Sequence, residues 1–195
     1  MAIKIYVDQG HNPVNPNAGA EGNGLREQDI TYRIGQELAA LLRADPNYEV
    51  RLSRPTADTQ LGTSLNSSLQ ARVQDANAWG ADYFISLHTN SFDDPELADK
   101  VSGFEIYATE AGTESYKFGN SLLPFLAEST NLRNRGMKIS NDLRILKNAT
   151  MPAILIEMGF ISNPSDATLM AESPELFAEA IYNGMLSYFD FTLPA

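Results

Sequence analysis

The chain contains two histidines, His11 and His88, and each is predicted to lie at or just after the end of a strand. In open α/β sheets, ligands bind in the crevice beyond the carboxyl ends of the strands, so residues far apart in sequence can meet there. Two glutamates fall at matching places: Glu27 in the first turn of a predicted helix, and Glu157 at the end of the apolar run AILIE. Two histidines and a glutamate as ligands, with a second glutamate as base, would form a catalytic zinc site with an open position for water.

Each of these residues also has a structural interpretation. A histidine that follows a strand is commonly a loop or capping residue, and the helix dipole favours an acid such as Glu27 in a first turn. Glu157 is harder to explain structurally, because an ionised carboxylate near a buried strand is costly unless it is paired, metal-bound or catalytic. The sixteen residues from His11 to Glu27 match no compact metal motif such as HExxH, so spacing alone leaves both interpretations open.

The hydrophobic pattern predicts the elements that must position these residues. Strands are predicted at IKIYVD from Ile3, VRLSR from Val50, YFISLH from Tyr83, GFEIYAT from Gly103 and AILIE from Ala153, with a short strand at Ile145 and Leu146. Helices are predicted from Glu27 to Asp45, from Leu65 to Gly80, from Thr113 to Glu128, where Pro124 could bend or break the helix, and from Pro174 to Phe189. Strands that alternate with helices indicate an α/β fold: a single domain whose mostly parallel twisted sheet has helices on both faces.

Length and composition limit the possible functions. A chain of 195 residues with 43% hydrophobic residues has the size of one domain, and it contains no cysteine, so a metal would need histidine and carboxylate ligands. The net charge of −11 argues against nucleic acid, which needs clustered Lys and Arg. No apolar segment approaches eighteen residues, and no signal peptide precedes the first strand. We therefore expect no membrane segment, no nucleic-acid partner and a monomer.

Three segments then resemble a known family. VDQGHNPVNPNAGAEGNGLREQD, FISLHTNS and MPAILIEMGFISN are similar, in the same order, to the three hallmark blocks of the zinc-dependent N-acetylmuramoyl-L-alanine amidases (Amidase_3). The resemblance extends from Ile3 to the last helix and includes NRGMKIS followed by LRILK. One departure is visible, because Asn12 and Pro13 stand where the family commonly has a second glycine.

The resemblance implies roles for individual residues. His11, Glu27 and His88 would be ligands of Zn²⁺, and Glu157 would be the catalytic glutamate. Residues 1–195 would form a single catalytic domain that hydrolyses the amide bond between N-acetylmuramic acid and L-alanine in peptidoglycan. Such an enzyme would be secreted or cell-wall associated, with its signal absent from this chain, or cytoplasmic until lysis if it is a phage lysin.

Two further residues and three other functions stay open. Asp8 either orients His11 or forms a turn at the strand end, and Arg144 either binds a carboxylate of the stem peptide or forms a structural salt bridge. A zinc peptidase is a competing hypothesis, although neither HExxH nor a His-any-any-Glu pair occurs. A wall-binding module without turnover and a sheet protein with two structural histidines are the remaining alternatives.

Overall fold

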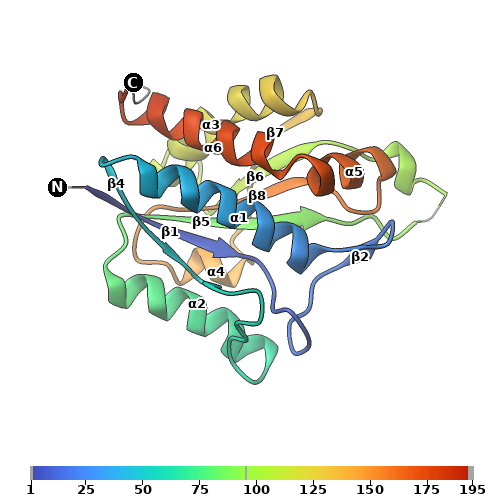
Figure 1. Cartoon of the computed structure of the whole chain (residues 1–195), viewed down its shortest axis with the longest axis horizontal. Coiled ribbons are helices and arrows are strands. Elements are labelled where there is room, and N and C mark those ends of the chain that lie inside the picture. The colour runs from blue at the N-terminus through green and yellow to red at the C-terminus, as the bar shows by residue number, and fades with distance from the viewer. Residues whose placement is uncertain (1, 95, 193–195) are drawn as a thin grey trace.

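Six strands form the central sheet, in the order β4-β1-β5-β8-β6-β7 (Figure 1). The computed structural model describes residues 2–94 and 96–192. All neighbouring strands pair in parallel except β6 and β8, which are antiparallel. The predicted mostly parallel sheet is therefore confirmed, with bounds β1 (Ile3–Gln9), β4 (Tyr48–Leu52), β5 (Tyr83–Asn90), β6 (Phe104–Ala108), β7 (Asn134–Ile139) and β8 (Ala153–Phe160).

Helices cover both faces of the sheet, as expected for strands that are apolar on both sides (Figure 1). One face carries α1 (Glu27–Ala44), α3 (Glu114–Thr130), α5 (Pro164–Glu172) and α6 (Pro174–Tyr188). Within the described residues, the other face carries α2 (Leu65–Trp79) and the single turn α4 (Arg144–Lys147). The second face is thus covered by much less helix than the first.

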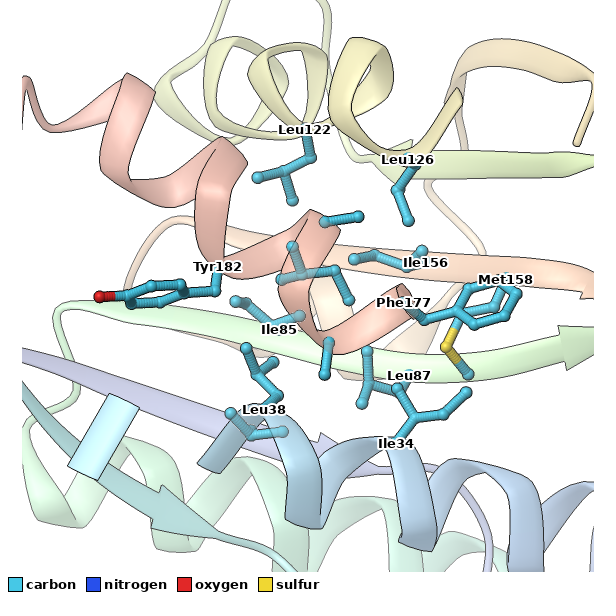
Figure 2. Close-up of a cluster of buried hydrophobic side chains, with 14 of the residues drawn as sticks. Ile34, Leu38, Ile85, Leu87, Leu122, Leu126, Ile156, Met158, Phe177 and Tyr182 are labelled. Carbon is cyan, nitrogen blue, oxygen red and sulfur yellow. The ribbon is translucent and has the colours of Figure 1, made fainter. Parts of the chain in front are cut away.

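The larger core lies between the sheet and the layer of α1, α3 and α6 (Figure 2). Ile34 and Leu38 of α1 point toward Ile85 and Leu87 of β5, and α6 packs against both α1 and α3. The smaller core, under α2 and α4, contains Phe84 of β5. Because apolar contacts hold β5 on both faces, the residues at its carboxyl end are fixed in position.

Local signals set the helix ends. The hydroxyl of Ser64 accepts a hydrogen bond from the backbone N–H of Ser67 at the start of α2, and Gly80 ends that helix in the left-handed conformation at φ 70°. The helix α3 continues past Pro124, so this proline does not break it. No helix in residues 2–94 and 96–192 is long and apolar enough to span a membrane.

Some local predictions were wrong or incomplete. Ile145 and Leu146 lie in the helical turn α4 and not in a strand; both are buried, and the backbone N–H of Leu146 donates a hydrogen bond to the carbonyl of Leu143 within the turn. The strand predicted from Val50 begins earlier, at Tyr48, and ends at Leu52. Elements that were not predicted are β7, α5, the short 3₁₀ turn Ala98–Lys100, and the hairpin of β2 (Glu21–Gly22) and β3 (Leu25–Arg26).

Candidate metal centre and catalytic site

The four predicted site residues meet at the carboxyl ends of β1, β5 and β8. His11 follows β1 by two residues, His88 lies near the end of β5, and Glu157 is its in-register neighbour in β8. Glu27 is the first residue of α1. These side chains therefore lie together, as their places at strand ends and at the start of a helix predict, although they come from four separate segments.

His11, Glu27 and His88 are in direct contact. The Nε2 atom of His11 lies 3.2 Å from one carboxylate oxygen of Glu27, and Nδ1 of His88 lies 3.1 Å from the other. One potential ligand atom from each residue can be chosen so that all three lie within 4.8 Å of one another. Two ring nitrogens and a carboxylate oxygen at these separations form a set that could hold a metal ion.

The carboxylate of Glu27 is held from several sides. The backbone N–H groups of Ala20 and Thr89 each donate a hydrogen bond of 2.9 Å to it, one to each oxygen. Burial acts to raise the pKa of Glu27, but hydrogen bonds and charge from the two histidines outweigh burial, so this pKa lies below its usual range. The side chain is therefore a fixed anion between two imidazoles.

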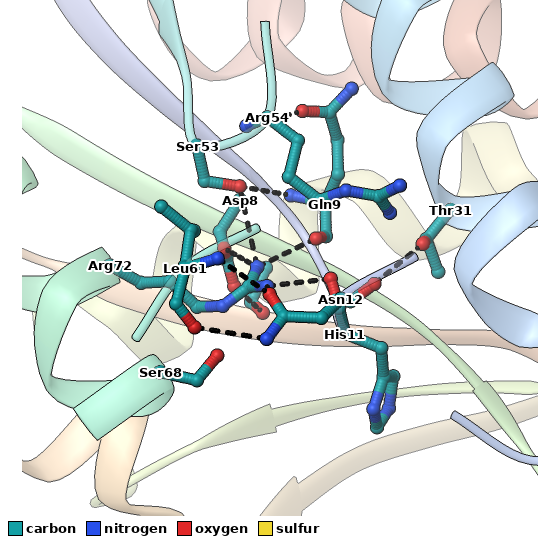
Figure 3. A network of polar contacts seen from close by, with 12 residues as sticks. Asp8, Gln9, His11, Asn12, Thr31, Ser53, Arg54, Leu61, Ser68 and Arg72 are labelled. Carbon is teal, nitrogen blue, oxygen red and sulfur yellow. Dashed lines mark hydrogen bonds and ion pairs between the residues drawn. The ribbon is translucent and has the colours of Figure 1, made fainter. Parts of the chain in front are cut away.

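His11 has an unusual backbone conformation, with φ at 68° in the left-handed region. Its carbonyl accepts a hydrogen bond of 2.6 Å from Nη2 of Arg72, a residue of α2 that is almost fully buried (Figure 3). Nη1 of Arg72 binds the carboxylate of Asp8 at 2.6 Å and the carbonyl of Gln9 at 2.7 Å. Arg72 thus fastens α2 to the turn that carries His11.

Asp8 is linked to the turn at His11 through Arg72. Its carboxylate is fully buried, pairs with Arg72 and accepts a hydrogen bond of 2.7 Å from the hydroxyl of Ser86. Burial acts to raise the pKa of Asp8, but the charge of Arg72 and these hydrogen bonds keep it below the usual value. Asp8 acts on the turn at His11 through Arg72, without a hydrogen bond to the imidazole among the described residues.

Gly10 allows the turn to approach β5. A Cβ atom at this position would lie 2.5 Å from the carbonyl oxygen of Leu87 and 2.6 Å from Cε1 of His88. Both distances are shorter than real Cβ contacts allow. Any larger residue at position 10 would therefore push the two histidine-bearing segments apart.

Glu157 is positioned as a second carboxylate beside the first three residues. Its Oε2 atom is buried and has no hydrogen-bond partner in the described part of the chain. Burial raises the pKa of Glu157 to about 8, and the negative charges of Glu27 and Glu105 act in the same direction. A carboxyl group with these properties can exchange a proton near neutral pH.

Arg144 lies elsewhere. It is in α4, and its Nη1 donates a hydrogen bond of 2.5 Å to the side-chain oxygen of Asn66 in a groove between α2 and α4. It forms no ion pair within residues 2–94 and 96–192, so the structural salt bridge predicted for it is absent there.

Arg72 was not predicted from the sequence, because a polar residue in a helix gives no sign that its partner stands sixty-four positions earlier.

The chain resembles known proteins over most of its length. Residues 5–187 match the N-acetylmuramoyl-L-alanine amidase family. The chain is 33% identical over 172 residues to the sporulation-specific N-acetylmuramoyl-L-alanine amidase of Bacillus subtilis, covering 88% of the chain and 61% of that protein. It is also 33% identical over 184 residues to the N-acetylmuramoyl-L-alanine amidase CwlM of Bacillus licheniformis, covering 93% of the chain and 65% of the relative. The chain therefore spans less than two thirds of the length of both relatives.

A solved structure agrees with these matches. The crystal structure of an N-acetylmuramoyl-L-alanine amidase from Clostridium difficile 630 superposes with a TM-score of 0.85 at 28% identity, covering 97% of each chain. The sheet order and the layers of helices are thus those of a known amidase structure. The chain belongs to the N-acetylmuramoyl-L-alanine amidase family of hydrolases.

Proposed function

We propose that the chain is a zinc-dependent N-acetylmuramoyl-L-alanine amidase that hydrolyses the amide bond between N-acetylmuramic acid and L-alanine in peptidoglycan. One observation carries the proposal: His11, Glu27 and His88 converge within 4.8 Å, with Glu157 in register beside His88. Residues 1–195 would act as one catalytic domain. Family membership supports the choice of bond.

The residues present fit a zinc ion. Zinc takes histidine nitrogen and carboxylate oxygen, and catalytic zinc sites use three protein ligands and leave one position open. Nδ1 of His11 is buried without a hydrogen-bond partner among the described residues, which supports a missing ligand or water close to this ring. When bound, zinc lowers the pKa of water from about 15.7 towards 7 and polarises a carbonyl group.

Glu157 supplies the proton transfers in this proposal. Its unpartnered Oε2 can accept a proton from the attacking water and return that proton to the departing amine of L-alanine. Protonation matters because a free amide anion is a very poor leaving group. The raised pKa of Glu157, about 8, suits a group that both takes and gives a proton.

Two competing functions fit less well. A wall-binding module without turnover has no use for a buried carboxyl group such as Glu157 beside a set of metal ligands. A zinc peptidase could use the same four residues, and it is distinguished by the bond that is cut. Family membership favours the amidase.

The substrate sets the place of action. Peptidoglycan lies outside the cell membrane, so we infer an enzyme that is secreted, associated with the wall, or released on lysis. The net charge of −11 supports neither nucleic acid nor the anionic wall polymers as partners, so recognition would depend on local contacts. We propose that the domain works as a monomer.

The test is a digest of purified peptidoglycan with zinc-loaded and chelator-stripped protein, with the new chain ends identified by mass spectrometry. We expect stem peptides with a free L-alanine amine, lost on chelation and restored by zinc. Cleavage within the stem peptide would instead assign a peptidase with the same metal centre. Protein that binds no zinc would contradict the assignment of His11, Glu27 and His88.

A further inference from the structure

A row of charged residues crosses the sheet, starting at the metal centre. Glu157 of β8 is the in-register neighbour of His88 on one side and of Glu105, in the antiparallel strand β6, on the other. In-register residues on adjacent strands point to the same face. The row therefore continues from the predicted metal ligand toward the edge strand β7, along the face that carries α2 and α4.

Glu105 is a buried anion with three donors. Its Oε1 accepts hydrogen bonds from the hydroxyl of Tyr107 at 2.7 Å and the side-chain amide of Asn90 at 3.2 Å. Its Oε2 accepts a hydrogen bond of 2.9 Å from Nε of Arg135 in β7. A carboxylate held in this way fixes the guanidinium of Arg135 above β6, beside the catalytic residues.

Within the described part of the chain, the guanidinium of Arg135 is bound to the protein through Nε, and its Nη groups are not. Its guanidinium carbon lies 5.1 Å from the ring centroid of Phe160, and its only hydrogen bond within the described residues comes from Nε. The side chain is 28% exposed, and neither Nη group donates a hydrogen bond within the described residues, so both are available to a ligand. A planar fork of N–H donors that is fixed on one side recognises carboxylates well.

A second positively charged residue, Lys138, adds to the positive charge at this end of the row. Lys138 of β7 is in register with Tyr107, whose hydroxyl reaches Glu105 on the same face. The edge strand therefore places two positive residues beside the site in a chain whose net charge is −11. An anion bound at this end would be attracted locally while the rest of the surface repels it.

We propose that Arg135 is a specificity-determining residue that binds the free α-carboxylate of the second residue of the stem peptide. The proposal deepens the amidase function and rests on it. The second residue is a D-glutamate joined through its side chain, so its α-carboxylate is free unless it is amidated. One strand spacing and one hydrogen bond put the guanidinium on the order of 8 Å from the carboxylate of Glu157. Two extended residues span about 7 Å from the scissile nitrogen to this α-carboxylate. This span is close to the separation between Glu157, which acts at the scissile nitrogen, and the guanidinium of Arg135.

The experiment compares two forms of one polymer. Peptidoglycan is isolated from a single bacterial strain with and without its amidating enzyme, so the second stem residue carries either an amide or a carboxylate. The initial rate of release of L-alanine amines is measured for wild type, Arg135→Gln and Arg135→Lys. Arg133→Gln is the matched control, because Arg133 is exposed two residues away and its replacement removes the same charge.

We expect wild type and Arg133→Gln to cleave the carboxylate form about tenfold faster than the amide form, because a charge-assisted hydrogen bond is about twice as strong as a neutral one. Arg135→Gln should cleave both forms at rates within about twofold, and Arg135→Lys should keep part of the preference. Zinc content and Tm identify any variant that has not folded.

Two results would overturn the proposal. The first is a wild type that cleaves the carboxylate and amide forms at equal rates. The second is an Arg135→Gln variant that is slower on both forms but keeps the tenfold ratio between them, which would indicate a purely structural role. Absence of amine release from either polymer with folded, zinc-loaded wild type would instead refute the amidase function itself, and the proposal with it.

Discussion

Replacing Arg72 with methionine tests how the turn at His11 is held. Arg72→Met keeps a long, flexible side chain but removes every hydrogen bond that the guanidinium makes to Asp8, Gln9 and His11. Asp8 is fully buried, so its charge would lose its ion-pair partner without gaining water. Breaking a buried pair in this way destabilises a protein by about 3 to 5 kcal/mol.

The corresponding change in Tm follows from the size of the chain. For domains of about 150 to 250 residues, 1 kcal/mol shifts Tm by roughly 2 to 4 °C, so Arg72→Met should lower Tm by about 6 to 20 °C. The matched control is Arg51→Met. Arg51 pairs with Asp75 at 2.7 Å, close to the distance in the buried pair, but both side chains are more than one third exposed. Such a surface pair contributes at most about 1 kcal/mol.

Two assays check the reasoning, thermal unfolding followed by circular dichroism and competition for zinc with a chromogenic chelator. Because Arg72 binds the carbonyl of His11, the variant should also bind zinc about 10- to 100-fold more weakly, as is usual when a partner of a metal ligand is lost. A Tm within about 2 °C of Arg51→Met would refute the view that the buried pair stabilises the fold. Unchanged zinc affinity would refute its role in positioning His11.

Three further changes test the site itself. Glu157→Gln should keep its zinc and lose about 10² to 10⁴ in rate, because no hydrogen bond among the described residues depends on the buried Oε2; comparable amine release by this variant would exclude the acid/base role. His11→Ala should fall well below one zinc per chain in elemental analysis, and full occupancy would show that this imidazole is not a ligand. Gly10→Ala should lower stability by about 1 to 3 kcal/mol in denaturant unfolding, since its Cβ would collide with the carbonyl of Leu87 and the ring of His88; a neutral effect would mean that the turn can move.

The fold was largely predictable because hydrophobic periodicity reports burial, and burial decides which elements form a parallel sheet covered on both faces. The wrong and missing predictions of secondary structure have local causes. Ile145 and Leu146 are only two apolar residues, too few to distinguish a strand from one helical turn. The strand β7, NRGMKI, is a half-buried edge strand whose pattern does not alternate. The hydrophobic pattern of residues 104–108 does not indicate the direction of a strand, so the antiparallel pairing of β6 with β8 could not be predicted.

The site was predictable only where position along a strand determines position in space. His11 and His88 follow that rule, since both lie at carboxyl ends of parallel strands. Glu27 follows it less directly, through the start of the next helix. Arg72 and Glu105 do not follow it, because each is identified by a partner on another element, which a single sequence does not reveal.

The two arginines differ in what remains after each has paired with a buried carboxylate. Both Nη groups of Arg72 are used by the chain, in bonds to Asp8 and to the carbonyls of Gln9 and His11, so this guanidinium holds the turn in place and has no capacity for a ligand. Arg135 uses only Nε to bind Glu105, and neither of its Nη groups donates a hydrogen bond within the described residues. The same ion-pair chemistry therefore gives a buried link beneath the candidate metal centre and, on the other side of Glu157, the arginine that we propose binds the substrate.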